Sequence, residues 1–262
     1  EPLATMCAAN EIPAQLIHLE ARLRLTQHME SGMDPQAIHE LLQLEIDRLV
    51  LMNFAERWPQ HRQQERAGLM ALLIEQQLQI KLGLDTQLQF HRGAGGKVAV
   101  TNPANGMQVQ HGFTPLEGAE LQQLVGTELT MHCRGVFMQQ APMVTLRGPP
   151  GTGKVETLVD VCRHIIGQPV HRLDCKDVRS AADVQPMFEL MNAGVFVICD
   201  SAEKLDPRLA AELVPALTAH AQAVHARNVS AGVGAGPALA WCYQHSTAEA
   251  IDSQLDAPSV DS

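Results

Sequence analysis

The sequence predicts an α/β fold in which a parallel β-sheet is flanked by helices. Residues 143–146 (Met-Val-Thr-Leu) are short, apolar and β-branched enough to form a buried strand, and they lead into a glycine-rich segment, 147–154. Apolar residues then recur at helical spacing through 158–166. A second apolar run, 194–200, has the composition of a parallel strand that is buried on both faces. Strand, loop, helix and second strand together indicate this fold class.

The glycine-rich segment reads Arg-Gly-Pro-Pro-Gly-Thr-Gly-Lys and follows the pattern G-x-x-x-x-G-K of a phosphate-binding loop. Its glycines allow backbone N–H groups to curl around phosphates, and its lysine contacts the terminal phosphates. The following helix would place its partly positive N-terminus against the same groups. We therefore expect a nucleotide to contact Gly148, Pro149, Pro150, Gly151, Thr152, Gly153, Lys154, Val155 and Glu156.

Two positions depart from what nucleotide hydrolysis requires. Val155 stands where Ser or Thr would offer a hydroxyl to Mg²⁺, and Thr157 cannot replace it because a residue two positions along a helix faces elsewhere. Asp200, at the end of a predicted strand, is expected to hold Mg²⁺ through water. Ser201 follows it where a catalytic Glu is usual, and serine cannot act as a carboxylate base. We expect ATP or ADP to bind, Mg²⁺ to bind more weakly, and hydrolysis to be impaired, with no residue assigned as catalytic.

The loop and its neighbours resemble the first AAA+ module of dynein heavy chains, whose loop ends in G-T-G-K-T-E-T. Residues 124–133 (LVGTELTMHC) are similar to the family segment L-V-x-T-P-L-T-x-R-C beside the adenine, which implies that Leu124 and Val125 lie at the base. Residues 173–177 correspond to the family's N-C-x-D turn, and Asp200 to the metal-site Asp of F-D-E-F-N-R-I. Residues 85–90 resemble the stretch where the dynein linker enters the ring.

The resemblance implies an ATP-binding AAA+ module of a microtubule-based motor. Its partners would be neighbouring AAA+ modules of the same chain or complex and the dynein complex subunits, and its location the cytoplasm, cytoskeleton or axoneme. The sequence departs from the family at Val155, Ser201, Glu128 and His132. Two alternatives stay open: an active dynein-type motor ATPase in which another group positions the attacking water, and a nucleic-acid helicase, whose loops also read G-P-P-G-T-G-K.

Composition argues against a direct nucleic-acid partner, because the net charge is −10 and aromatic residues make up only 3% of the 262 residues. The sequence has no apolar run of roughly 18 residues, so we expect no membrane span. The six cysteines are scattered without a C-x-x-C pair. A zinc site from Cys162, His164, His171 and Cys175 is not favoured, because the first two face different sides of a helix.

The sequence divides into three parts. Residues 1–84 are predicted to be a helical, linker-like region. Residues 85–228 are predicted to be the nucleotide-binding domain, with a β-hairpin at 86–113, the phosphate loop at 148–155 and the metal-site strand at 195–200. Residues 229–262 are rich in Ala, Gly and Ser and are expected to be a low-complexity, disordered tail.

Helical periodicity predicts the elements outside the sheet. Asp34-Pro35 is predicted to begin a helix, with an apolar stripe of Ile38, Leu42, Ile46, Leu49 and Val50. Further helices are expected at 59–82 and 210–226.

Overall fold

The structure is a computed structural model that describes residues 2–8, 12–55, 60–82, 88–114, 124, 126–138, 142–230, 237–243 and 259–261. The chain divides into two compact units. One unit comprises 1–106 and 115–126, and the other comprises 107–114 and 127–262. The predicted boundary at 84/85 therefore differs from the division in the structure, in which most of the predicted hairpin belongs with the N-terminal helices.

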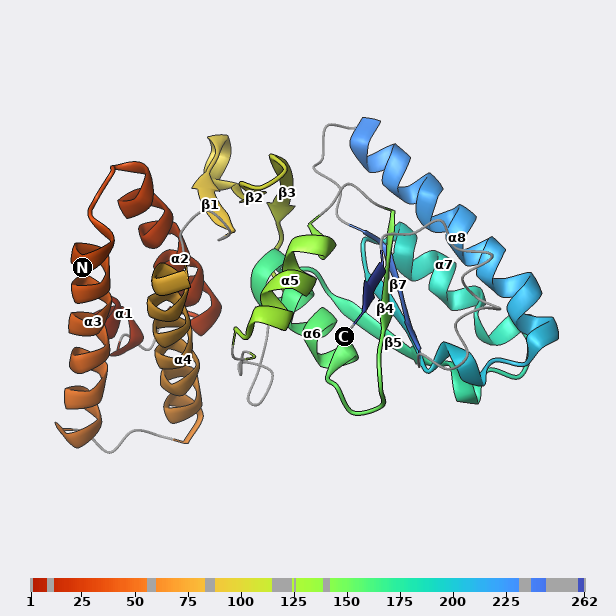
Figure 1. Ribbon diagram of the computed structural model, residues 1–262, viewed down its shortest axis with the longest axis horizontal. Helices are drawn as coiled ribbons and strands as arrows, with labels where there is room; N and C mark the ends of the chain where they lie inside the picture. The colour runs from red at the N-terminus through yellow and green to blue at the C-terminus, as the bar shows by residue number, and fades with distance from the viewer. Residues whose placement is uncertain are drawn as a thin grey trace. The chain divides into compact units, whose positions relative to one another are not determined.

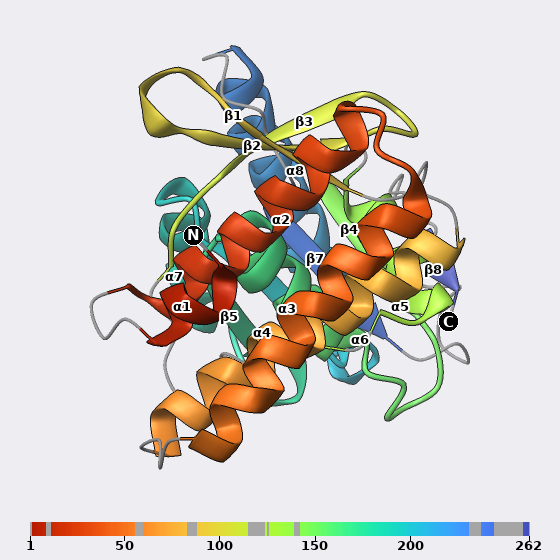
Figure 2. The ribbon, with the colours of Figure 1, turned by 90° about the vertical axis from the view of Figure 1, so that its left-hand side faces the viewer.

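Within its described residues, the N-terminal unit contains four α-helices: α1 (Leu3–Ala8), α2 (Ala14–Glu30), α3 (Pro35–Ala55) and α4 (Gln60–Leu82). Pro35 is the first residue of α3, as predicted from its fixed φ and its missing N–H. Helices α3 and α4 run side by side (Figure 2). Their apolar stripes share one core with residues of α1 and α2, to which they contribute Ile38, Leu42, Ile46, Leu49, Leu69, Leu72 and Leu73. Val50, the last member of the predicted stripe, is 36% exposed and lies outside that core.

Three short strands follow the helices as an antiparallel sheet in the order β1-β2-β3. They are β1 (Gln89–Arg92), β2 (Val98–Asn102) and β3 (Met107–His111), and the first two pair with Phe90 opposite Val100. Gly106 has a φ of 69° and its N–H donates to the Asn102 carbonyl over 2.8 Å. Asn105 and Gly106 thus lie in a turn, the structure that an Asn-Gly pair between two strands favours.

The second unit is built on a parallel sheet in the order β5-β6-β7-β4-β8. Its strands are β4 (Met143–Arg147), β5 (Val170–Asp174), β6 (Phe196–Asp200), β7 (Leu239–Tyr243) and β8 (Ser259–Asp261). Its helices are α5 (Glu128–Phe137), α6 (Lys154–Asp160), which continues as a π-helical turn over Val161–Ile166, α7 (Gln185–Asn192) and α8 (Pro207–Ser230). Figure 1 shows α5 and α6 on one face of this sheet and α7 and α8 on the other. The predicted α/β fold with a parallel sheet flanked by helices is confirmed.

The predicted disorder of the tail from 229 is wrong for three segments, one of which is β8. Helix α8 continues to Ser230, and β7 lies between β4 and β6, with Trp241 opposite both Thr145 and Cys199. All five β7 residues are buried. Leu-Ala-Trp-Cys-Tyr is a continuous apolar run, the pattern of a strand buried on both faces. Because the surrounding residues are rich in Ala, Gly and Ser, the average composition of 229–262 does not reveal this strand.

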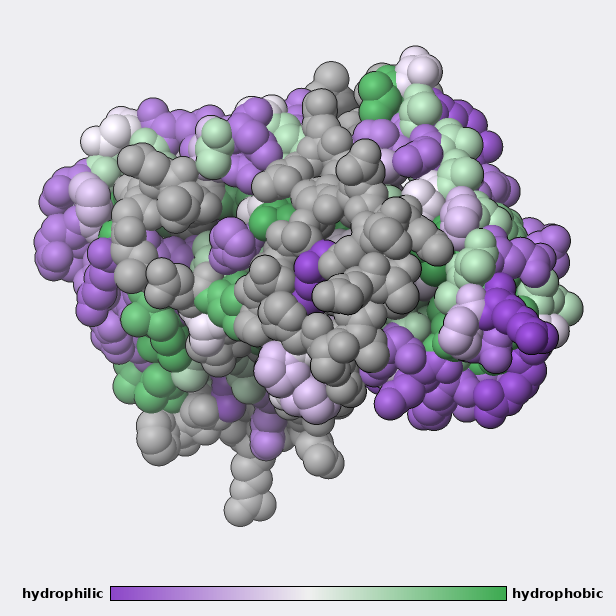
Figure 3. All heavy atoms as spheres, turned by 45° about the vertical axis from the view of Figure 1, so that its right-hand side comes forward, coloured by the Kyte–Doolittle hydropathy of each residue, from purple (hydrophilic) through white to green (hydrophobic). Residues whose placement is uncertain are grey.

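In the part of the chain that the structure describes, no helix is both long enough and apolar enough to cross a lipid bilayer. The longest of these helices, α8, has 24 residues and carries its buried side chains along one side, at Leu213, Val214, Leu217, Ala221 and Val224. Over the outer helices of the second unit, hydrophilic and moderately hydrophobic residues alternate on the surface (Figure 3). The buried apolar side of α8 is what an amphipathic helix that covers one face of a sheet presents to that sheet.

Candidate functional site

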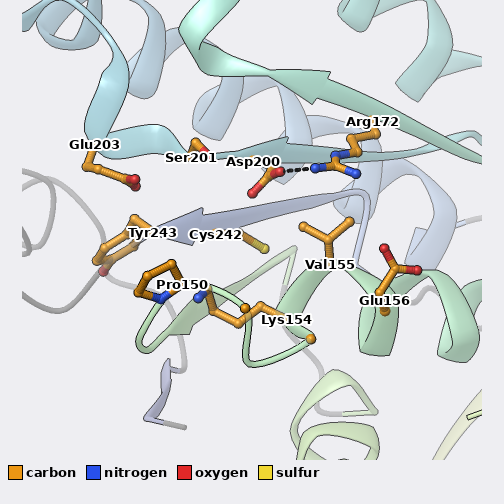
Figure 4. A pocket seen from close by; sticks show the side chains of 12 residues that line it. Pro150, Lys154, Val155, Glu156, Arg172, Asp200, Ser201, Glu203, Cys242 and Tyr243 are labelled. Carbon is orange, nitrogen blue, oxygen red and sulfur yellow. Dashed lines mark hydrogen bonds and ion pairs between the residues drawn. The ribbon is translucent and has the colours of Figure 1, made fainter.

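A cavity of about 330 Å³ opens at the carboxyl ends of β5, β6 and β7, beside the loop that follows β4 (Figure 4). The chain passes from β4 by way of α6 to the distant β5, and then returns through α7 and α8 to β6 and β7. This reversal puts the connecting helices on opposite faces of the sheet and leaves a crevice where they part. The lining residues are Pro150, Gly151, Gly153, Lys154, Val155, Glu156, Arg172, Asp200, Ser201, Glu203, Cys242 and Tyr243.

The loop between β4 and α6 depends on two glycines in the left-handed region. Gly151 has a φ of 77° and Gly153 a φ of 78°, and Gly153 is the N-cap of α6. Residues with a Cβ rarely adopt these angles, so the loop could not keep this path with other side chains there. The Thr152 hydroxyl donates to the Pro149 carbonyl over 3.0 Å and closes the loop internally.

The Lys154 ammonium group lies against its own loop. Its Nζ donates to the carbonyl oxygens of Gly148, over 2.9 Å, and Pro149, over 2.7 Å. Lys154 is the first residue of α6 and lines the cavity, as does Glu156 in the same turn. The loop residues predicted to contact phosphate are therefore brought together, with the lysine held by carbonyls that a phosphate oxygen could replace.

The Val155 side chain presents methyl groups to the cavity, at the position where the sequence lacks the usual hydroxyl. The nearest replacement in the chain, Thr157, is buried, and its hydroxyl donates to the Gly153 carbonyl over 2.9 Å. Thr157 is not among the cavity-lining residues. Thr157 therefore faces away from the cavity, as expected, and its inability to replace the missing hydroxyl stays a prediction.

Asp200 lies at the end of β6, as predicted, but its carboxylate already has a cationic partner. Arg172, on the neighbouring β5, donates from Nη2 to Asp200 Oδ2 (Figure 4). The strand register explains this pair: β5 and β6 run parallel, with Arg172 opposite Ile198, two residues before Asp200, so a long side chain reaches along the strand. Sequence reasoning missed Arg172, because nothing in the sequence tells which strand is the neighbour of β6.

Ser201 takes the place expected for a catalytic Glu and has an unusual backbone. Its φ is 55°, and no other non-glycine residue in the described segments has a positive φ. Such a conformation stores strain of roughly 1–3 kcal/mol, and strain of this kind is concentrated at functional sites. Glu203, to which the sequence analysis assigned no role, also lines the cavity.

The end of β7 supplies two further lining residues that sequence reasoning missed. Tyr243 is buried, and its hydroxyl oxygen accepts a hydrogen bond from Arg147 Nε over 2.9 Å. Its carbonyl accepts from the Gly148 N–H over 3.3 Å, so β7 is tied to the start of the phosphate loop. Burial raises the pKa of the adjacent Cys242 thiol above its ordinary value, which keeps it protonated. The apolar run in β7 was the available signal for both residues.

Mg²⁺ prefers oxygen ligands in near-octahedral geometry, and the two positions that usually supply protein oxygens at such a loop do not fit that demand here. Val155 offers no oxygen, the Thr157 hydroxyl is engaged elsewhere, and the Asp200 carboxylate is paired with Arg172. Among the described residues, no three or more His, Cys, Asp and Glu side chains are grouped to hold a metal ion. The expected role of Asp200 in holding Mg²⁺ stays a prediction. Its ion pair with Arg172 argues against that role.

The predicted contact of Leu124 and Val125 with the base also stays a prediction. Val125 lies outside the described residues, and Leu124 belongs to the N-terminal unit. Nearby, Thr127 begins α5 with a capping box, in which its side chain and that of Thr130 satisfy each other's backbone N–H groups. Residues 128–133 of the segment that resembles the dynein sequence are thus helical.

No protein-family model matches this chain, and no curated protein matches it at a significant level. The fold and the cavity therefore carry the functional argument. They define a parallel α/β unit whose glycine-rich loop, lysine and strand-end carboxylate converge at one edge of the sheet.

Proposed function

We propose that this chain is an ATP- and ADP-binding module of the AAA+ class, similar to the first module of dynein heavy chains, with impaired hydrolysis. One observation carries the proposal. A loop with two left-handed glycines joins a buried parallel strand to a helix, and its lysine lines a cavity at the carboxyl edge of the sheet. This arrangement suits a polyphosphate, because backbone N–H groups, the helix N-terminus and an ammonium group all favour negative charge there.

Slow hydrolysis follows from the side chains that surround the loop. Val155 gives no oxygen to a metal ion, and Ser201 gives no carboxylate to the attacking water. Glu203 lines the cavity, but it lies in a short 3₁₀ turn. That turn begins after Ser201, whose backbone is left-handed. ATP would then organise the module or signal to a neighbouring one. The dynein resemblance extends the proposal to AAA+ neighbours and dynein subunits as partners and to the cytoskeleton or axoneme as location.

Nucleotide binding is tested by titrating ATP and ADP into the whole chain by calorimetry. We expect Lys154→Ala to weaken binding by about tenfold or more, because a charged donor to the phosphates is lost. Lys204→Ala is the matched control, since Lys204 is exposed and outside the cavity lining. Equal affinity of the unmodified chain and Lys154→Ala, or no binding at all, would refute the proposal.

Turnover separates the proposal from its two alternatives. Phosphate release is measured for the unmodified chain, for Val155→Thr, and for Val155→Thr combined with Ser201→Glu. The single variant is needed because a Glu at 201 must adopt the left-handed φ or shift the turn. We expect only the combined variant to gain rate. If the unmodified chain is equally fast, the active motor ATPase holds instead, and stimulation of turnover by single-stranded nucleic acid would favour the helicase.

A further inference from the structure

A cationic side chain of the protein, that of Arg172, lies beside the position predicted for the metal ion. Arg172 and Asp200 form an ion pair on the wall of the cavity, with Arg172 half-exposed and Asp200 largely covered. Figure 4 shows the guanidinium group on the same side of the cavity as the Val155 methyl groups. A guanidinium group has five N–H donors, so donation to Asp200 leaves others for a phosphate.

The ordinary oxygen ligands of Mg²⁺ are missing at this wall. The two protein oxygens of this kind of site are a hydroxyl after the lysine and a carboxylate at a strand end. Here the first is replaced by Val155 and the second is occupied by Arg172. Mg²⁺ at Asp200 would compete with the Arg172 guanidinium for the carboxylate, with no hydroxyl from residue 155 as a further ligand. Retaining Arg172 as the counter-charge to the phosphates costs no such rearrangement.

We propose that this cavity binds nucleoside polyphosphates without Mg²⁺, and that the Arg172 guanidinium supplies the positive charge that the metal ion supplies elsewhere. The inference rests on the proposed nucleotide-binding function. Lys154 and Arg172 approach the cavity from different elements, α6 and β5. Together they can hold the phosphates from two sides. Arginine suits this role better than lysine, because its planar fork donates to two phosphate oxygens at once.

The test compares ADP affinity in EDTA with ADP affinity in Mg²⁺, using the full chain and calorimetry. We expect the two dissociation constants of the unmodified chain to agree within about twofold, since the hydroxyl that usually binds the metal is absent and Asp200 is engaged by Arg172. Arg172→Ala is expected to weaken binding in EDTA by about tenfold or more. Arg208→Ala is the control, because Arg208 is exposed and lies outside the cavity lining.

A repaired variant tests the same idea in the opposite direction. Val155→Thr combined with Arg172→Ala restores the hydroxyl and frees Asp200, so binding should become stronger in Mg²⁺ than in EDTA by about tenfold. If the unmodified chain needs Mg²⁺ for tight binding, this inference fails while the nucleotide-binding proposal stands. If Arg172→Ala binds ADP in EDTA like the unmodified chain, the role of Arg172 fails. Absence of binding under both conditions would remove the proposed function itself.

Discussion

Arg134 and Asp160 form a buried ion pair in which Nη2 lies 2.9 Å from Oδ2, with side chains only 3% and 4% exposed. The pair joins α5 to α6, the helix that begins with Lys154. Removing one partner leaves the other charge buried without this counter-charge, which typically costs about 3–5 kcal/mol. The pair therefore links the stability of the phosphate-loop helix to α5.

The first prediction concerns this pair. Arg134→Ala and Asp160→Ala should each lower the free energy of unfolding by about 3–5 kcal/mol. Arg134→Met combined with Asp160→Leu should cost much less, because no unpaired charge is buried in the double variant. Urea unfolding measures all three. Arg48→Ala serves as the surface control at about 0–1 kcal/mol, since the Arg48 side chain is 42% exposed in its pair with Glu45. Equal losses for single and double variants would contradict the prediction.

A second prediction concerns Trp241, which is fully buried at the centre of the sheet. Trp241→Ala should destabilise the chain by about 3–5 kcal/mol through lost contacts and the cavity left behind. Trp241→Phe should cost less, because the ring position stays filled and Nε1 has no hydrogen-bond partner within the described residues. Thermal and urea unfolding compare the two variants. A Trp241→Ala chain as stable as the unmodified one would show that β7 is not a central strand.

The third prediction concerns two glycines whose replacement by alanine should change the stability in opposite directions. Gly167 has a φ of 71°, and a Cβ there would collide with the Gly112 carbonyl, while the Gly112 N–H donates to the Ile166 carbonyl over 2.7 Å. Gly167→Ala should therefore destabilise the chain by more than about 1 kcal/mol. Gly135 lies inside α5 with open space around its Cβ position, so Gly135→Ala should stabilise by about 0.5–1 kcal/mol. Unfolding curves that shift in the same direction for both would contradict this account.

A fourth prediction concerns the six cysteines, all of which are buried and outside any disulfide. Burial raises the pKa of Cys133 and Cys242, and raises that of Cys162 well above its ordinary value. At pH 8 the native chain should react with a thiol reagent much more slowly than the urea-unfolded chain, because the reactive thiolate is scarce and covered. Fast reaction of any thiol in the native state would argue against its burial.

The raised pKa values of these thiols also determine whether the free energy of unfolding rises or falls with pH. A thiol whose folded pKa is raised contributes its full stability below the unfolded pKa, about 8.5, and loses it as pH rises further. We expect the free energy of unfolding to fall above about pH 8.5, and Cys242→Ala to make that fall shallower. Urea titrations at a series of pH values measure both slopes.

Much of the fold was readable from local patterns. The buried strands β4 and β6, the glycine loop and the apolar stripe that begins at Ile38 each show a periodicity or a turn signal within a few residues. Strand β7 was missed although its residues are entirely apolar, because the surrounding Ala, Gly and Ser residues outweighed a five-residue signal.

In the candidate site too, the sequence determines the chemistry of single residues, and the tertiary structure determines their spatial arrangement. The sequence alone determined that the loop carries Gly151, Gly153 and Lys154 and lacks a hydroxyl at Val155, because these properties belong to single residues at fixed spacing. Only the tertiary structure decided that Arg172 pairs with Asp200 and that Tyr243 abuts the loop. Those relationships depend on which strands are neighbours and in what register, and strand order is set by non-local packing that no short stretch of sequence encodes.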